Sequence, residues 1–184
     1  LTQLEIDLSD GTKRIIPTDN SWVTRSGPIV GSDLIMGEDY DARIPLNLSS
    51  PAADIEKISN NQEMWAPVNI FSQPKNLSLN TQIAPPIRVQ GELAPEGKPM
   101  RIKTTKGICW IFDFGQNLVG RVQLRIVGER GQKIIMKFGE MLAEDGSLYT
   151  DNLRTARQTD TYILRGDKDG ENYESWFTFH GFRY

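Results

Sequence analysis

The stretch RVQLRIVGERGQKIIMKFGEML, residues 121–142, indicates the fold class. Apolar Val122, Leu124 and Ile126 alternate with polar residues, and this period of two places them on one face of a strand. The run KIIMKFGEML repeats the alternation, and the Gly-containing GERGQ between the two runs is short enough for a hairpin. The stretch therefore predicts two neighbouring antiparallel strands, each with one face toward a core.

Strand signals dominate the rest of the chain as well. TDTYILRG and YESWFTFHGFRY are rich in Thr and aromatic residues, and DKDGEN between them has the composition of a turn. Near the start, apolar and acidic residues alternate over 4–8, and Asp10-Gly11 predicts a hairpin turn. A short helix of one or two turns is expected only within residues 50–65. We predict an all-β chain with little helix, built from antiparallel β-sandwich or jelly-roll domains.

A proline-rich stretch divides the chain. Residues 74–99 hold five of the ten prolines, and Pro85-Pro86 precede a strand-like run, which is typical of an extended connector. We therefore expect a first domain with its linker at residues 1–82 and a second domain at residues 83–184. Both ends interrupt strand-like runs and no leader is visible, so we expect the chain to be part of a longer polypeptide.

Composition excludes several classes of function. The net charge of −3 comes from 24 acidic and 21 basic residues that are interspersed, so the sequence has no basic run for nucleic acid. No apolar run reaches the roughly 20 residues that span a bilayer, and membrane partners are not expected. The single cysteine, Cys109, cannot form an internal disulfide or a thiolate metal site. The compartment is not encoded in these features.

Two polar positions suggest chemistry at first sight. Asp113 is followed by Gly115, Gln116 and Asn117 and could be an acid or base, but a carboxylate that caps a structural corner needs no second catalytic group, and we favour the corner. His180 is the only histidine, and the chain has no G-x-S-x-G elbow to supply a nucleophile. We therefore expect a structural or interface role for His180.

Carboxylates gather in two other regions. The loop FGEMLAEDGSLYTDN is the most acidic segment, but it is interrupted by Gly146 and offers no apolar pocket, so we interpret it as a solvated loop. In the N-terminal part, Asp19, Asn20 and Asp41 supply oxygen ligands, and Trp22 supplies a flat apolar face. Sugars are bound by aromatic stacking together with planar polar groups, and calcium is bound by oxygen ligands. Asp19, Asn20 and Asp41 are therefore candidates for carbohydrate or calcium binding, and Trp22 can equally be a core residue.

A set of ordered motifs resembles one protein family. The motifs are W-x-x-x-x-GPI (22–29), SD (32–33), GE-x-YDAR (37–43), PPIRV (85–89), DFGQN-x-VG (113–120), EML-x-x-DGSLYT-x-NLR (140–154), A-x-x-TDTY (156–162) and F-x-FHGFRY (177–184). Together they are similar to the non-catalytic β-domains of bacterial alpha-L-rhamnosidases, inverting glycoside hydrolases that release terminal L-rhamnose. The resemblance covers most of the chain and is poorest between Asn47 and Ile70.

The resemblance implies a division of labour. Residues 1–82 would be the last part of a galactose-binding-like jelly roll, which in some relatives binds L-rhamnose with calcium. Residues 83–184 would be the β-sandwich that precedes a catalytic (α/α)₆ barrel, and the acid and base of the family belong to that barrel. No catalytic residue is therefore expected here and no cofactor is required, while Asp113, Gln116, Asn117, His180 and Arg183 would be structural or lie between domains.

Three functions remain open at this point. The chain can be a non-catalytic part of a rhamnosidase that acts on rhamnose-containing glycans, a stand-alone module that binds rhamnose or galactose, or a structural spacer. Under the first alternative, the loop of residues 140–157 and the strand FHGFRY are expected to contact the catalytic helical domain. Linkage specificity and oligomeric state are not readable from the sequence.

Overall fold

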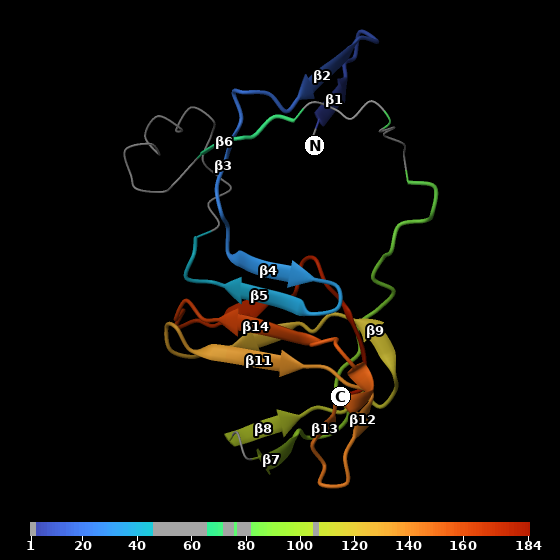
Figure 1. Cartoon of the computed structure of the whole chain (residues 1–184), viewed down its shortest axis with the longest axis vertical. Helices are drawn as coiled ribbons and strands as arrows, with labels where there is room; N and C mark the ends of the chain where they lie inside the picture. The colour runs from blue at the N-terminus through green and yellow to red at the C-terminus, as the bar shows by residue number, and fades with distance from the viewer. Residues whose placement is uncertain (1–2, 46–65, 72–75, 77–81, 105–106) are drawn as a thin grey trace. The chain divides into compact units, whose positions relative to one another are not determined.

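The computed structural model describes residues 3–45, 66–71, 76, 82–104 and 107–184. The described residues form β-strands and one short 3-10 helix, Asp151–Leu153 (Figure 1). The prediction of an all-β chain with little helix is therefore confirmed. The helix expected within residues 50–65 lies outside the described residues.

The chain forms two compact units. The first unit consists of residues 1–26 and 47–87, and the second consists of residues 27–46 and 88–184. These units and the predicted domains are different divisions of the chain, so the boundary after residue 82 stays a prediction.

The first unit contains two antiparallel pairs. Strands β1 (Gln3–Asp7) and β2 (Lys13–Pro17) form the hairpin predicted from Asp10-Gly11, and β3 (Val23–Thr24) pairs with β6 (Ala66–Pro67). In the hairpin turn, Asp10 Oδ1 accepts hydrogen bonds from the backbone N–H and the hydroxyl of Thr12, and Gly11 has a φ of 82°. A left-handed backbone at this position favours glycine, which explains the turn signal in the sequence.

The second unit is built on a four-stranded sheet. Its strands are β11 (Lys133–Lys137), β14 (Thr159–Ile163), β5 (Gly37–Asp41) and β4 (Ile29–Asp33), in that spatial order (Figure 1). The pairing of β14 with β5 is parallel, whereas the other two pairings are antiparallel. Because β4 and β5 precede β14 by more than a hundred residues, this sheet joins distant parts of the chain.

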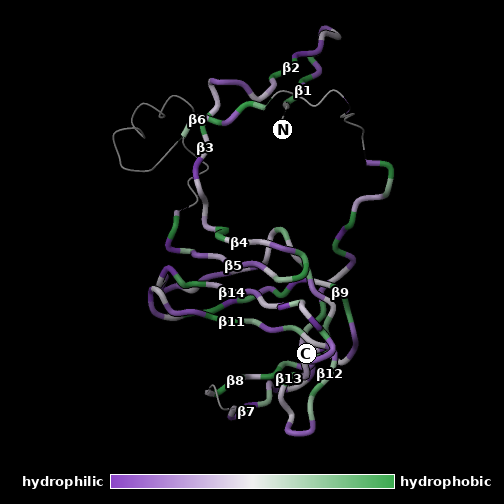
Figure 2. Tube along the Cα trace, viewed as in Figure 1, coloured by the Kyte–Doolittle hydropathy of each residue, from purple (hydrophilic) through white to green (hydrophobic). Residues whose placement is uncertain are grey.

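Two-stranded antiparallel sheets complete the second unit. Leu124–Ile126 (β10) pairs with Glu171–Tyr173 (β15), and Leu118–Gly120 (β9) pairs with His180–Phe182 (β16). Two further pairs are the hairpins of β7 (Met100–Thr104) with β8 (Gly107–Ile111) and of β12 (Met141–Leu142) with β13 (Leu148–Tyr149). The tip between β12 and β13 is hydrophilic (Figure 2).

The core of the second unit lies between the four-stranded sheet and the β10–β15 pair. Tyr162 and Leu164 pack against Tyr173, and half-buried apolar residues of β5, β10 and β11 surround them. Tyr40 lies 5.6 Å from Tyr162 and 5.4 Å from Tyr173 between ring centroids, while Tyr162 and Tyr173 are 4.7 Å apart. Three tyrosine rings in mutual contact therefore join the two layers.

The predicted hairpin at GERGQ is wrong. β10 and β11 do not pair with each other, because β10 pairs with β15 and β11 pairs with β14. The turn itself exists, with the N–H of Gln132 donating to the carbonyl of Glu129 at 3.0 Å, but it carries the chain from one layer to the other. The turn between β14 and β15 returns the chain to the first layer, so the paired strands β11 and β14 lie between the two turns and the paired strands β10 and β15 lie outside them.

Within the described residues, no helix is both long and apolar enough to cross a membrane.

Candidate functional site

Asp113 is at the centre of a hydrogen-bonded corner after β8. Its Oδ1 accepts the Gly115 N–H at 2.7 Å and the Arg183 Nε–H at 2.8 Å, and its Oδ2 accepts Arg183 Nη2 at 3.0 Å. Gly115 has a φ of 76°, and a side chain there would collide with Glu96. The hydrogen bonds from Arg183 and Gly115 lower the pKa of the Asp113 carboxyl below its ordinary value, so this carboxylate is a poor proton donor.

Asn117 and Gln116, the other two candidates of this corner, make fewer contacts than Asp113. Asn117 donates from Nδ2 to Glu140 Oε1 at 3.0 Å, so it connects the corner to the start of the β12 segment. Gln116 is exposed. Arg183 lies with its guanidinium carbon 5.1 Å from the centroid of the Tyr184 ring, in addition to its ion pair with Asp113. These contacts hold the last strand against the β8–β9 corner.

His180 is buried in β16 and paired with an acid. Its Nε2 lies 2.9 Å from Asp160 Oδ1, which also accepts the backbone N–H of Glu38 at 2.9 Å. The imidazole stacks on Phe138 with 4.1 Å between ring centroids and 12° between planes. Its Nδ1 is buried and has no hydrogen-bond partner among the described residues. The His180 side chain is fully buried, so the imidazole lies inside the unit and has no open face for a substrate.

Glu38 is a second buried acid, and its burial was not predicted from the sequence. Its side chain is fully buried, and Oε1 accepts the Tyr173 hydroxyl at 3.1 Å. Oε2 accepts the backbone N–H groups of Trp176 at 3.0 Å and Phe177 at 3.1 Å. Burial and the nearby Glu38 charge raise the pKa of Tyr173, so its hydroxyl stays a donor. Glu38 of β5 therefore fixes the segment between β15 and β16.

Glu171 is the third buried acid. Its Oε1 accepts the N–H groups of Gly166 at 2.8 Å and Asp167 at 3.1 Å, and its Oε2 accepts the Arg165 N–H at 2.9 Å and the Tyr162 hydroxyl at 2.8 Å. Burial raises the pKa of Glu171, but the hydrogen bonds outweigh burial and the pKa is lowered. Successive N–H groups thus form a nest around this carboxylate.

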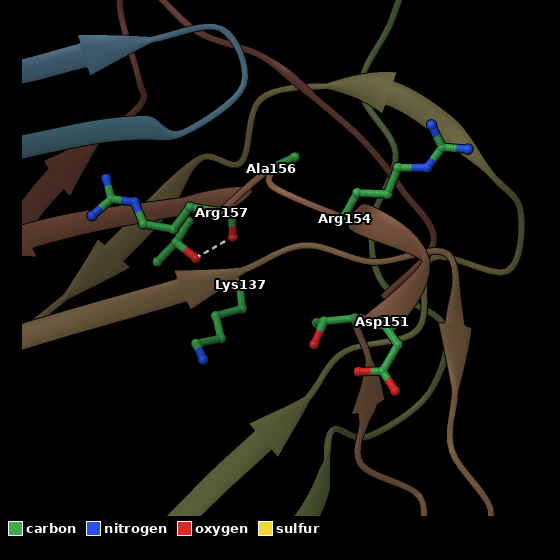
Figure 3. A pocket seen from close by; sticks show the side chains of 7 residues that line it. Lys137, Asp151, Arg154, Ala156 and Arg157 are labelled. Atoms are coloured by element: carbon green, nitrogen blue, oxygen red, sulfur yellow. Dashed lines mark hydrogen bonds between the residues drawn. The ribbon is translucent and has the colours of Figure 1, made fainter.

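The acidic loop after β12 borders an open cavity of about 630 Å³ lined by Lys137, Thr150, Asp151, Arg154, Ala156, Arg157 and Thr159. The labelled charged side chains point in different directions, with Arg154 and Arg157 directed away from each other (Figure 3). Arg157 is already used, because it donates to Met36 O at 3.0 Å and to Asp39 Oδ2 at 3.0 Å. Since the groups do not converge on one point, this cavity lacks the geometry of a catalytic centre.

The three candidate ligands of the N-terminal part fall in different units. Asp19 and Asn20 belong to the first unit, where Asp19 Oδ1 accepts the N–H and hydroxyl of Ser21, and Asp41 belongs to β5 of the second unit. Arg43 occupies both oxygens of Asp41, with Nη2 2.7 Å from Oδ2 and Nε 2.8 Å from Oδ1. A calcium ion at Asp41 would therefore have to displace Arg43 from the carboxylate.

No group of three or more His, Cys, Asp or Glu side chains within the described part of the chain could hold a metal ion. The roles predicted for Asp19, Asn20 and Asp41 in binding sugar or calcium stay predictions.

A second open cavity, of about 640 Å³, lies at the outer side of the β10–β15 pair. Its lining includes Trp176 and planar polar side chains, which are Arg121, Gln123, Arg125, Asn172 and Glu174. Sequence reasoning missed this group, although alternation in QLRI and ENYES places its polar members on the face opposite the core. The signal was present, but the pairing of the two segments was not predicted.

Comparison with known proteins gives matches along almost the whole chain. Residues 1–91 match the alpha-L-rhamnosidase N-terminal domain, and residues 103–184 match the bacterial alpha-L-rhamnosidase concanavalin-like domain. Alpha-L-rhamnosidases of Streptomyces avermitilis and Formosa agariphila are 38% and 35% identical over all of this chain. The chain spans only 17% and 19% of the lengths of these two relatives.

Solved structures give the same relationship. The crystal structure of Streptomyces avermitilis alpha-L-rhamnosidase complexed with L-rhamnose aligns with a TM-score of 0.81 at 38% identity and covers 98% of this chain and 16% of that one. The structure of the alpha-L-rhamnosidase from Dictyoglumus thermophilum aligns with a TM-score of 0.80 at 32% identity and covers 98% of this chain and 19% of that one.

Proposed function

Because this chain belongs to the bacterial alpha-L-rhamnosidase family, we propose that it is a non-catalytic β part of a protein that hydrolyses terminal α-L-rhamnosyl residues of glycans or glycosides. The chain spans only a small fraction of the length of its relatives, and the two domains that it matches are the N-terminal and concanavalin-like ones. The bond-breaking residues would then belong to another part of the protein.

The hydrogen bonds that the buried acids accept are the observation that supports this proposal. Inverting glycosidases need one carboxylic acid with a raised pKa and a second carboxylate, about 6.5–9.5 Å away, that activates water. Here Glu38, Asp160 and Glu171 each accept two or more hydrogen bonds inside the second unit, and the pKa of Glu171 is lowered. Their lone pairs hold strands and turns together, which is a supporting role and not an acid–base role.

A supporting role also explains why the backbone is strained at two residues that follow β13. Arg154 and Gln158 have φ angles of 55° and 41°, which cost free energy for residues with a side chain. Gln158 is held by backbone hydrogen bonds to Ile35 and Phe138 at 3.1 Å each. We propose that the loop of residues 140–157 and the FHGFRY stretch (179–184) contact the catalytic helical domain of the parent protein.

The test compares the 184-residue chain with the longer protein that carries it, using an aryl α-L-rhamnoside. We expect release of the aryl group by the longer protein and none by the chain alone. Hydrolysis by the purified chain would overturn the proposal, and so would a longer protein that leaves rhamnosides intact but cleaves another glycoside.

Calorimetry of the chain with L-rhamnose, with and without Ca²⁺, tests the calcium-dependent binding predicted from Asp19, Asn20 and Asp41. Binding heat that appears only with Ca²⁺ and disappears in Asp19→Ala supports that role. Binding that is equal in both conditions would contradict it.

A further inference from the structure

The second open cavity, here called the Trp176 cavity, differs from the cavity beside the acidic loop in the side chains that line it. Arg125 and Asn172 are direct cross-strand partners in the β10–β15 pair, and both are exposed. Their neighbours Leu124 and Tyr173 are also partners and face the core. Because side chains alternate along a strand, Gln123 lies on the outer face with Arg125. This outer face therefore carries a row of planar polar groups.

Trp176 stands beside this row with its side chain open to solvent. The residue is 57% exposed, yet its backbone is held by buried groups. Its N–H donates to Glu38 Oε2 at 3.0 Å, and the preceding residue, Ser175, is 1% exposed. Arg121 donates from Nη1 to the Ser175 carbonyl at 2.8 Å and pairs through Nη2 with Glu174 at 2.6 Å. An exposed indole on a fixed backbone is a preorganised contact surface, which lowers the entropic cost of binding.

The chemistry of the cavity selects the class of ligand. A flat indole covers the apolar C–H face of a sugar ring, and guanidinium, amide and carboxylate groups match neighbouring hydroxyls in pairs. The charges of Arg121 and Glu174 compensate each other, which leaves Arg125 as the single uncompensated charge of the lining within the described residues. An anion would be met by one uncompensated guanidinium only. An apolar peptide would find one exposed large apolar side chain, because Leu124 and Tyr173, which also line the cavity, face the core.

We propose that the Trp176 cavity is a glycan-binding subsite, in which the indole stacks on a sugar ring and Arg125 and Asn172 hydrogen-bond its hydroxyls. Gln123 borders the subsite, and its Nε2 donates to Glu92 Oε1 at 3.5 Å. That the sugar belongs to a rhamnose-containing glycan rests on the proposed function. The cavity of about 640 Å³ is open and falls within the usual range of ligand sites, so it suits a segment of a glycan chain that continues into solvent. The subsite retains the polysaccharide near the protein and performs no chemistry.

The test uses the migration of the 184-residue chain in a native gel that contains a rhamnose-rich polysaccharide. Trp176→Ala is the principal variant, and it keeps the backbone N–H that Glu38 accepts. The matched control is Trp110→Ala on β8, because Trp110 is 55% exposed and does not line the cavity. We expect the wild type and Trp110→Ala to be retarded, and the apparent affinity of Trp176→Ala to fall at least about tenfold. Asn172→Ala should fall severalfold.

Equal retardation of all variants, or none of the wild type, would overturn the subsite. Retardation by a rhamnose-free polysaccharide of the same charge that also depends on Trp176 would keep a glycan site and reject rhamnose. If acrylamide quenches Trp176 in the chain but not in the longer protein, this residue is an internal contact of that protein and the proposal fails. The rhamnosidase assay separates the two proposals, because activity of the longer protein without Trp176-dependent binding leaves the proposed function standing alone.

Discussion

Replacing Glu171 by glutamine removes the charge from the nest between β14 and β15 without changing the shape of the side chain. The two carboxylate oxygens accept four hydrogen bonds, from three backbone N–H groups and the Tyr162 hydroxyl. A glutamine keeps one oxygen and turns its NH₂ toward two of the donors, so two of the four hydrogen bonds are lost. Glu171→Gln should therefore destabilise the second unit.

The size of the effect follows from the contacts. A hydrogen bond to a charged group contributes about 1.5–3 kcal/mol, and two such bonds give about 3–6 kcal/mol. Gly166 and Asp167 are only half-buried, so water recovers part of this amount. We expect the free energy of unfolding to fall by about 3 kcal/mol, which corresponds to a urea midpoint lower by about 1.5 M for a slope near 2 kcal/mol/M.

Urea titrations followed by near-ultraviolet circular dichroism measure this change, because the tyrosine cluster of the second unit gives the signal. Glu144→Gln is the matched control, since Glu144 is exposed and its replacement should stay within about 0.5 kcal/mol. If Glu171→Gln shifts the midpoint no more than this control, the nest does not stabilise the fold and the reasoning is refuted.

The pH dependence gives an independent check on the same residue. The pKa of Glu171 is lowered in the folded protein, so its contribution is complete above the ordinary glutamate value of 4.5 and is lost as the pH falls through the folded value. The difference between wild type and Glu171→Gln should therefore shrink below about pH 4.5. A difference that grows on acidification would mean that the sign of the pKa shift is wrong.

Three further predictions test other contacts of the second unit. Gly37→Ala should lower the unfolding free energy by about 3 kcal/mol or more in a thermal melt, because φ is 103° and a Cβ would lie 2.2 Å from the Thr159 carbonyl oxygen; an unchanged melting temperature would contradict this contact. Leu164→Ala should cost about 2–5 kcal/mol in urea, since the side chain is fully buried, and a cost below about 1 kcal/mol would place Leu164 outside the core. Arg183→Lys keeps the charge but loses the two-pronged ion pair, so the pKa of Asp113, measured by NMR, should rise toward its ordinary value; no rise would show that Arg183 does not hold it down.

The strands of the chain could be predicted from the sequence because their signal is local. The period of two in KIIMK is present in the structure, where Ile134 and Met136 face the core and Lys133, Ile135 and Lys137 are exposed. The Asp10-Gly11 turn is equally local, because the side chain and the glycine satisfy the hydrogen bonds and dihedral angles of the turn themselves. Patterns of this kind need no knowledge of the partner strand.

Strand pairing and the burial of the acids could not be predicted, because they depend on contacts between strands that a local sequence pattern does not contain. A short glycine-containing turn fits both a hairpin and a crossing between layers, and the tyrosine contacts that select the crossing come from β5, β14 and β15. Glu38, Asp160 and Glu171 look like surface residues in the sequence, because charged residues are seldom buried without a partner. Their partners lie up to 139 positions away, as for Glu38 and Phe177.

The contribution of β4 and β5 to the second unit makes the boundary of this unit testable. Residues 83–184 alone would lack β5, which leaves the β14 edge unpaired and removes the Glu38 acceptor from Tyr173, Trp176 and Phe177. Each hydrogen bond to this charged group contributes about 1.5–3 kcal/mol, so the loss of three approaches the whole stability of an ordinary domain of about 5–15 kcal/mol. We expect residues 83–184 to give an NMR spectrum with the poor chemical-shift dispersion of an unfolded chain, and residues 27–184 to give a well-dispersed spectrum. Dispersed spectra and equal urea midpoints for both would show that the unit folds without β4 and β5 and would support the boundary predicted after residue 82.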